Sequence, residues 1–77
     1  MYISVSYYKP EIQGYDTRPY TYETDLDLIP GDIVSAPTAK KPEGNKAMVV
    51  ALDLPTPNFP CKKITEMWVE AEEGENG

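Results

Sequence analysis

The sequence predicts a small all-β domain, a five-stranded β-barrel, within its 77 residues. Eight prolines and five glycines, without a periodic apolar segment long enough for an ordinary helix, favour short strands joined by tight turns. Residues 30–32, Pro-Gly-Asp, form a turn that Asp32 is expected to cap, and the turn leads into the β-branched segment 33–37. A second apolar segment, 47–52, follows after a lysine-rich break. Two such segments around a break are typical of the central hairpin of a small barrel.

The first strand is predicted at residues 1–8. Its side chains alternate with a period of two, so that Ile3, Val5 and Tyr7 share one face of a half-buried strand. We expect Ile3 and Val5 to face the core. A lysine-proline pair ends this strand, and residues 11–17 are expected to form a loop.

The second strand is predicted at residues 18–23, with Tyr20 and Tyr22 on the same face. Leu26 and Leu28 follow at strand-like spacing or within one helical turn. We expect these leucines to fill the interior of the barrel.

The rest of the chain divides into four segments. Residues 38–46 are too polar and too interrupted by Pro and Gly to be anything but an exposed hairpin tip. Residues 55–60 are proline-rich and predict an extended connection. Residues 61–69 predict a fifth strand with apolar groups on both faces, which leaves its orientation open. The domain is therefore expected to span residues 1–69, followed by a disordered acidic tail at residues 70–77.

The formal net charge is −6, which by itself disfavours a polyanionic partner, because phosphate contacts need clustered Lys or Arg. The distribution of charge weakens this objection. Four of the 13 acids lie in residues 70–77, so the remainder of the chain carries nine acids against seven bases, a net charge of −2. The predicted barrel is nearly neutral, and a nucleic-acid partner is not excluded.

Cysteine and histidine usage excludes several kinds of chemistry. With Cys61 as the single cysteine and no histidine, the chain has no intramolecular disulfide and no nucleophile–imidazole pair, and a zinc site has little support. No apolar run approaches the roughly 20 residues needed to cross a bilayer, and the N-terminal residues lack the order of a signal peptide. We expect a cytoplasmic protein without a cofactor, a metal, a membrane association or an enzymatic activity.

Four segments, Tyr20-Thr21-Tyr22, residues 28–37, Val49-Val50 and residues 61–64, together resemble the N-terminal DNA-binding domain of the primosomal replication-restart helicase, PriA. In that family an aromatic-x-Tyr strand precedes a Gly-x-x-Val-x-Val-Pro strand, a Val-rich strand returns, and a Leu-Lys-x-Ile strand closes the domain. The corresponding segments here are Tyr20-Thr21-Tyr22, Leu28-Ile29-Pro30-Gly31-Asp32-Ile33-Val34-Ser35-Ala36-Pro37, Val49-Val50 and Cys61-Lys62-Lys63-Ile64. Their order and approximate spacing agree across about 50 of the 77 residues.

The resemblance implies an OB-like or SH3-like barrel that receives the 3′ end of a DNA strand at a stalled replication fork. It places Tyr20, Thr21 and Tyr22 at the aromatic segment, and Cys61 and Lys62 beside the terminal nucleotide. An aromatic wall can stack a base, a small polar group can hydrogen-bond the sugar or base edge, and a lysine can neutralise a phosphate. Tyrosine also fills half-buried strand positions, so both roles stay open for these rings.

The lysines of the hairpin tip are further candidates for phosphate contacts. They form one basic rim with the lysines of the fifth strand if the tip lies over the start of that strand, and otherwise they are only solvated. Because five lysines give little phosphate affinity at physiological salt, weak binding is expected. The five candidates are Lys40, Lys41, Lys46, Lys62 and Lys63.

The sequence departs from the family pattern at three places. Pro37 is followed by Thr38 and Ala39, where family members have Phe-Gly and a basic residue. Ala47 stands where a glycine often precedes the returning strand, and Thr21 stands where an aspartate is frequent. All three differences lie close to the expected pocket.

We therefore expect a non-catalytic module that binds single-stranded or 3′-ended DNA in DNA replication. The chain is either an excised domain or a free-standing homologue, for which a mobile element is one source. The alternative is an acidic protein-interaction module that regulates a basic partner such as a replication protein. The first and fourth strands are rich in Tyr and Val, and unless they are paired they would offer edges that also allow homodimerisation.

Overall fold

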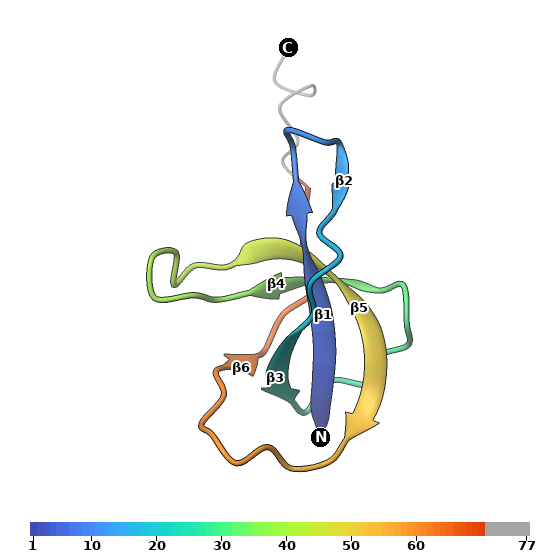
Figure 1. The fold of residues 1–77 in the computed structure, drawn as a ribbon. Helices are drawn as coiled ribbons and strands as arrows, with labels where there is room; N and C mark the ends of the chain where they lie inside the picture. Colours follow the sequence, from blue (N-terminus) through green and yellow to red (C-terminus); the bar gives the residue numbers. More distant parts are fainter. Residues whose placement is uncertain (71–77) are drawn as a thin grey trace.

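In the computed structural model, which describes residues 1–70, six strands form one mixed sheet that curls into a nearly closed barrel (Figure 1). The order of the strands across the sheet is β4-β5-β1-β3-β6, and β2 pairs with the end of β1 beside the barrel. The strands are β1 (Tyr2–Lys9), β2 (Gly14–Tyr15), β3 (Tyr20–Thr24), β4 (Ile33–Ala36), β5 (Asn45–Leu54) and β6 (Lys63–Ile64).

The barrel closes through the segment that follows β6. β6 pairs in parallel with β3, whereas the other pairs of neighbouring strands are antiparallel. Beyond β6, Met67 forms an antiparallel bridge with Val34 of β4, and the N–H of Ser35 donates to the carbonyl oxygen of Glu66 at 3.1 Å. The two sides of the sheet therefore meet, and β6 with the residues after it acts as the fifth strand of the barrel.

Apolar side chains from all five barrel strands form the core. Ile3 and Val5 are fully buried, which confirms the face predicted for β1. Leu28 is buried and Leu26 packs against the core, as expected for residues that fill the barrel. The carboxylate of Asp32 accepts a hydrogen bond from the N–H of Ile29 at 3.0 Å, so this residue caps its turn as predicted. The other buried apolar residues are Tyr22, Val34, Ala36, Ala47, Val49 and Ile64.

β1 is more buried than its alternating pattern predicts. Ser4 and Ser6, on the face opposite the core, are also buried. The reason is that β1 lies between β3 and β5, and short serine side chains extend little beyond the backbone. β5 is likewise paired on both sides, with β4 and β1. The first and fourth predicted strands are therefore paired on both sides, and neither is the open edge that they would form if unpaired.

Two predicted boundaries also need correction. The segment 11–17 is not a simple loop, because it contains β2, which forms a hairpin with the end of β1. Tyr8 and Tyr15 are partners in this hairpin, and their rings meet edge to face at 5.3 Å between centroids, a contact that stabilises cross-strand pairs. The predicted fifth strand at 61–69 is discontinuous, since regular pairing covers only β6 and resumes as the bridge at Met67.

The predicted hairpin between residues 33 and 52 is present as β4 and β5, and its tip extends away from the barrel (Figure 1). β5 begins at Asn45, so Lys46, which was predicted in the tip, lies in the strand. Gly44 ends the tip with a φ of 112°, and a Cβ there would lie 1.8 Å from the hydroxyl oxygen of Ser35. Glycine is therefore required at this position.

The chain leaves the barrel at Glu70, whose carboxylate lies 2.6 Å from the ammonium of Lys46. The remainder of the predicted tail, residues 71–77, lies outside the described residues. Across residues 1–70 no helix has the length and apolar character needed to span a membrane.

Candidate functional site

A pocket of about 430 Å³ opens beside β3, between the start of the β4–β5 hairpin tip and the β5–β6 connection. Its size falls within the range of about 300–1,000 Å³ that is usual for small-ligand sites. Five of the residues that line it are the ones that the resemblance placed around a terminal nucleotide: Tyr20, Thr21, Tyr22, Cys61 and Lys62. The fold thus brings together two segments that lie about forty residues apart in the sequence.

The parallel pairing of β3 with β6 holds these two segments side by side. The N–H of Glu23 donates to the carbonyl oxygen of Lys62 at 3.0 Å. One residue further, the hydroxyl of Thr24 donates to the carbonyl oxygen of Ile64 at 2.8 Å and accepts from the N–H of Leu26 at 3.1 Å. Thr24 is fully buried, so these bonds are shielded from water and keep Lys62 beside β3.

Three tyrosine rings form one wall of the pocket. The rings of Tyr7 and Tyr20 are stacked, with centroids 4.7 Å apart and an angle of 29° between their planes. Tyr7 also meets Tyr22 edge to face, at 6.5 Å and 83°. Tyr22 is only 5% exposed, whereas Tyr20 is half-buried. Tyr20 therefore offers ring surface to a ligand, and Tyr22 supports the wall from within.

The hydroxyl of Tyr22 ties the wall to the base of the hairpin tip. It donates to the carbonyl oxygen of Pro37 at 2.8 Å and accepts from the hydroxyl of Tyr7. Burial, and then the hydrogen bond with Tyr7, raise the pKa of the Tyr22 phenol well above its ordinary value. Tyr22 is therefore uncharged at neutral pH, and its hydroxyl is used within the protein rather than offered to a ligand.

The β5–β6 connection supplies an apolar part of the pocket through Phe59, Pro60 and Cys61. Phe59 is 56% exposed, which is unusual for the only phenylalanine of a small domain. The thiol of the half-buried Cys61 points toward the carbonyl oxygen of Phe59, with 3.8 Å between sulfur and oxygen. The exposed ring of Phe59 is a second surface on which a flat ligand can pack.

Tyr7 and Phe59 were not predicted as site residues. The alternation of the first strand predicted Tyr7 on the core face, and Tyr7 does pack against the core. The alternation could not predict that Tyr7 also lines the pocket. Phe59 could have been predicted, because an aromatic residue in a proline-rich connection lies outside the strands that form the core.

The five candidate lysines do not form one rim. Lys62 borders the pocket, and Lys40 and Lys41 lie in an adjoining groove at the hairpin tip. The ammonium of Lys46 lies 4.7 Å from the centroid of the Tyr8 ring and pairs with Glu70. Lys63 pairs with Asp25 at 2.6 Å, which raises the pKa of Lys63 and lowers that of Asp25, and it lies away from the pocket.

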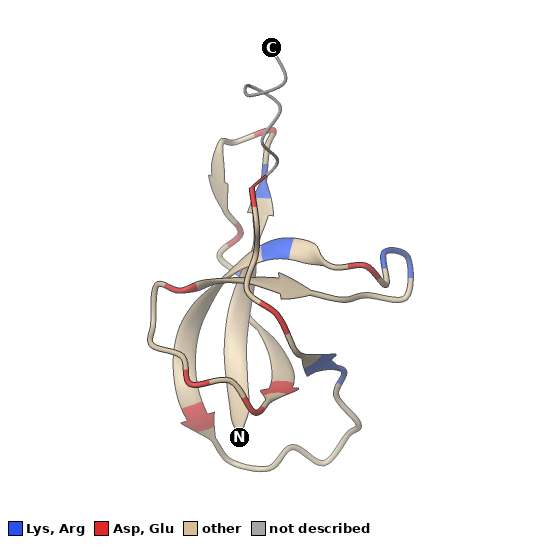
Figure 2. Ribbon diagram, turned by 180° about the vertical axis from the view of Figure 1, so that it is seen from behind, with Lys and Arg blue, Asp and Glu red and all other residues tan. Residues whose placement is uncertain are grey.

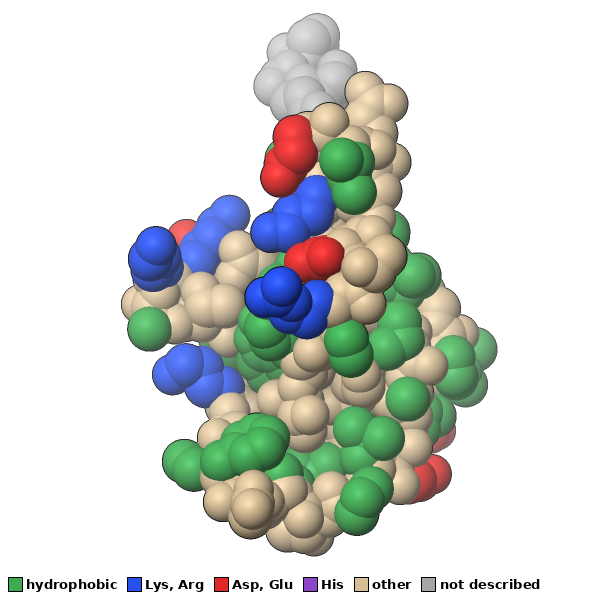
Figure 3. Space-filling view, viewed as in Figure 1, with side chains coloured by type: hydrophobic (Ala, Val, Ile, Leu, Met, Phe, Trp, Pro, Cys, Tyr) green, Lys and Arg blue, Asp and Glu red, His purple; other side chains and the backbone are tan. Residues whose placement is uncertain are grey.

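Charge is unevenly distributed around the barrel. In Figure 3, basic side chains gather over the upper left of the molecule, around the hairpin tip and the β1–β2 hairpin, and hydrophobic ones lie below them. In Figure 2, from behind, acidic residues lie along the β3–β4 connection and at the lower ends of β3 and β5. None of the residues that line the pocket is acidic. An anionic ligand would therefore meet the less acidic side of the chain.

Comparison with models of protein families, with curated proteins and with solved structures gives no match for this chain. The resemblance to the restart helicase thus stays a prediction that depends on the order of a few short segments. The geometry of the pocket can be assessed independently: it can hold a flat aromatic group against Tyr20 with an anionic group near Lys62.

Proposed function

We propose that this chain is a non-catalytic module that binds the end of a single DNA strand, with the terminal base in the pocket beside β3. The observation that carries the proposal is the composition of this pocket. It combines partly exposed aromatic rings, a lysine on the rim and no acidic side chain, in a chain whose net charge is −6. Proteins that bind single strands combine aromatic platforms with basic groups in the same way.

Stacking on Tyr20 supplies most of the affinity in this proposal. A base that stacks on an aromatic side chain contributes about 1–3 kcal/mol. The Tyr20 ring is held from behind by its stacked contact with Tyr7, which is itself tied to Tyr22 and the core. A ring that is already fixed loses little entropy when the base binds, and so it is a better platform than a mobile one.

Lys62 supplies the charge for the adjacent phosphate. Its backbone is held by the β3–β6 pairing while its side chain is exposed at the rim. One phosphate contact on a single strand contributes a salt slope of only about −0.7 in log affinity against log salt concentration. The pocket alone therefore predicts weak binding that changes modestly with salt. The preference for a 3′ end, and the role in replication restart, follow from the resemblance.

The proposal can be tested by titrating the 8.6 kDa chain with short oligonucleotides at low salt. Fluorescence anisotropy would compare strands that end in a 3′ hydroxyl with strands that end in a 3′ phosphate, and amide chemical shifts would locate the contact. We expect the 3′-hydroxyl strand to bind more tightly, with the largest shifts in residues 20–22 and 59–62.

Tyr20→Ala is the variant that removes the platform. Binding should weaken about 5- to 150-fold, which corresponds to about 1–3 kcal/mol for one stacked base. Tyr2→Ala is the matched control, because Tyr2 lies at the opposite end of β1 from Tyr7 and does not line the pocket. Absence of binding at high micromolar protein, or equal affinities for Tyr20→Ala and Tyr2→Ala, would contradict the proposal.

A further inference from the structure

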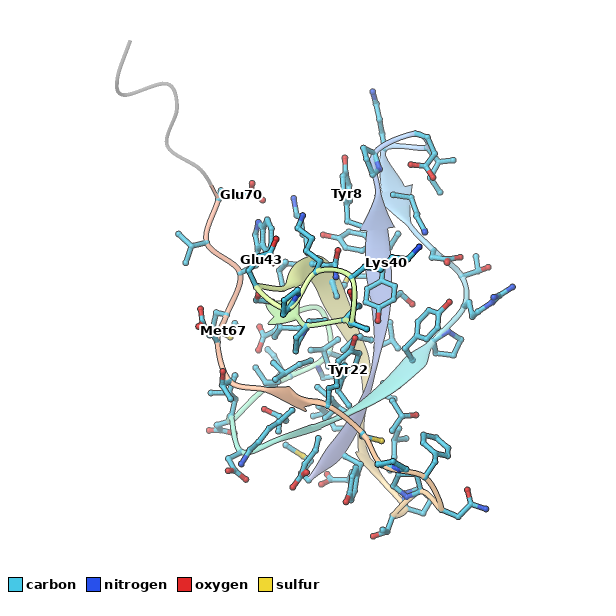
Figure 4. The ribbon with its side chains drawn as sticks, turned by 90° about the vertical axis from the view of Figure 1, so that its left-hand side faces the viewer. Tyr8, Tyr22, Lys40, Glu43, Met67 and Glu70 are labelled. Atoms are coloured by element: carbon cyan, nitrogen blue, oxygen red, sulfur yellow. The ribbon has the colours of Figure 1, made fainter. Side chains whose placement is uncertain are left out.

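A second hollow adjoins the pocket. This groove, of about 510 Å³, lies between the end of β1 and the tip of the β4–β5 hairpin. It shares Tyr7 and Thr38 with the pocket, so the two hollows meet along one side of the molecule. Figure 4 shows this side, with Tyr22 lowest, Lys40 above it and Tyr8 above Lys40.

The groove is basic although the chain as a whole is acidic. Lys9 lines it from β1, Lys40 and Lys41 line it from the hairpin tip, and Glu43 is its one acidic member. The ion pairs within residues 1–70 involve Lys46 and Lys63, so within this part of the chain none of the three groove lysines forms an ion pair. Three lysines on two sides of one groove form a site for an extended anion.

Both aromatic rings of the groove, Tyr7 and Tyr8, are already engaged by the protein, and that of Tyr7 is stacked on Tyr20. The ammonium of Lys46 lies over the ring of Tyr8, 4.7 Å from its centroid, and the ring of Tyr15 meets it edge to face. Tyr8 therefore offers little free surface to a base, in contrast to Tyr20 in the pocket. The groove is suited to phosphates rather than to bases.

We infer that the groove binds the phosphates of the nucleotides that precede the terminal one, so that the chain holds a segment of DNA strand and not only its end. This inference rests on the proposed function, because the pocket determines where the strand ends. The strand passes from the pocket over Tyr7 and Thr38 into the groove. Contacts in the groove are made to the backbone, so they add affinity without adding sequence preference.

The experiment compares a thymidine dinucleotide with a thymidine octanucleotide, both with a free 3′ hydroxyl. The wild-type chain should bind the octanucleotide at least about tenfold more tightly at low salt, because only the longer strand reaches the groove lysines. The triple variant K9Q/K40Q/K41Q should bind the octanucleotide no better than the dinucleotide. Its slope of log affinity against log salt concentration should be smaller in magnitude by about 2, since three phosphate contacts are lost.

Two controls separate charge from structure. Lys63→Gln removes a lysine that lies outside both hollows, and it should leave both affinities unchanged. The variant K9R/K40R/K41R keeps the charges and should bind the octanucleotide as the wild-type chain does. Amide spectra of each variant would show that the barrel is intact, which is expected because Lys40 and Lys41 are exposed.

The outcomes distinguish this inference from the proposed function. If the two strands bind equally well and Tyr20→Ala weakens both, the groove inference is overturned and the pocket proposal stands. If the lysine variant weakens octanucleotide binding but Tyr20→Ala has no effect, the groove binds DNA phosphates as inferred, and the pocket proposal, with the placement of the strand end that depends on it, is overturned. If neither strand binds at any salt concentration, both are overturned.

Discussion

The pocket and the groove adjoin at Tyr7 and Thr38, but their walls are held in place by different means. The pocket is built on strands: its tyrosines contact the core, and Tyr22 hydrogen-bonds across to Pro37. The groove depends on a hairpin tip whose lysines are exposed and whose shape depends on Gly44. A rigid aromatic site and a looser basic site thus lie side by side, which suits them to different parts of one ligand.

The pocket and the groove also differ in how their contributions to DNA affinity change with salt concentration. Stacking in the pocket depends on ring position and changes little with salt, whereas the lysines of the groove act through screened charge. Changes in the pocket should therefore alter stability and end recognition together. Changes at the hairpin tip should alter salt-dependent affinity with a smaller effect on folding.

The largest effect is expected from Tyr22→Phe, which tests the pocket. Removing the hydroxyl leaves the carbonyl of Pro37 and the hydroxyl of Tyr7, both partly buried, without this partner, and full burial of an unsatisfied group costs about 1–3 kcal/mol. We expect the free energy of unfolding in urea to fall by about 2 kcal/mol. Tyr7→Phe is the matched control and should cost less, because Tyr22 keeps its bond to Pro37. A larger loss for Tyr7→Phe would contradict this account.

Tyr22 also predicts that the stability of the fold decreases at alkaline pH. Because the pKa of Tyr22 is raised in the folded state, the folded chain holds the phenolic proton more tightly than the unfolded chain. This contribution to stability is fully present below about pH 10, the ordinary pKa of tyrosine, and is lost as the pH rises toward the folded value. Urea unfolding above pH 10 should show stability falling by up to about 1.4 kcal/mol per pH unit. Tyr22→Phe should remove this part of the fall.

An intermediate effect is expected from Gly44→Ala, which tests the hairpin tip. The new methyl group would displace the hydroxyl of Ser35, which now donates to the carbonyl of Glu43, and the backbone has a φ of 112°. We expect a loss of about 1–2 kcal/mol in thermal or urea unfolding. Gly31→Ala is the control, since Gly31 also has a positive φ but has open space around it. If Gly31→Ala is the more damaging change, contact with Ser35 is not what requires Gly44.

The smallest effect is expected from Glu70→Gln, which releases Lys46 without changing either hollow. Glu70 is exposed and Lys46 is only half-buried, so the pair is well solvated and we expect at most a small change in thermal stability. The released ammonium should strengthen octanucleotide binding slightly at low salt, with a salt slope that becomes steeper by at most about 0.7. A marked loss of stability in a thermal melt would show that the pair with Glu70 fixes β5.

Much of the fold could be predicted because it depends on local patterns. Alternation identified Ile3 and Val5 as core residues, and the Pro-Gly-Asp turn located the β4–β5 hairpin. β2 was missed because two residues carry no readable alternation, and their pairing depends on the contact between Tyr8 and Tyr15. The break after β6 was missed because apolar side chains on both faces hide where a strand loses its partner.

The candidate site was predicted in part. The grouping of Tyr20, Thr21 and Tyr22 with Cys61 and Lys62 came from the resemblance, and the structure brings these residues into one pocket. Spacing alone would not have grouped them, because a parallel pair of strands joins segments with no fixed separation in sequence. The lysines were harder to assign, since five similar side chains turned out to occupy four different surroundings.

The sequence by itself determined the class of fold, the core face of β1 and the position of the central hairpin, because each depends on residues within a few positions of one another. Only the tertiary structure decided that Tyr7 stacks on Tyr20 and that Phe59 lines the same pocket. It also decided that Lys46 and Lys63 form ion pairs, whereas Lys40 lines the groove. Ring contacts and ion pairs form over distances of a few ångströms, and closure of the barrel determines which distant residues come that close.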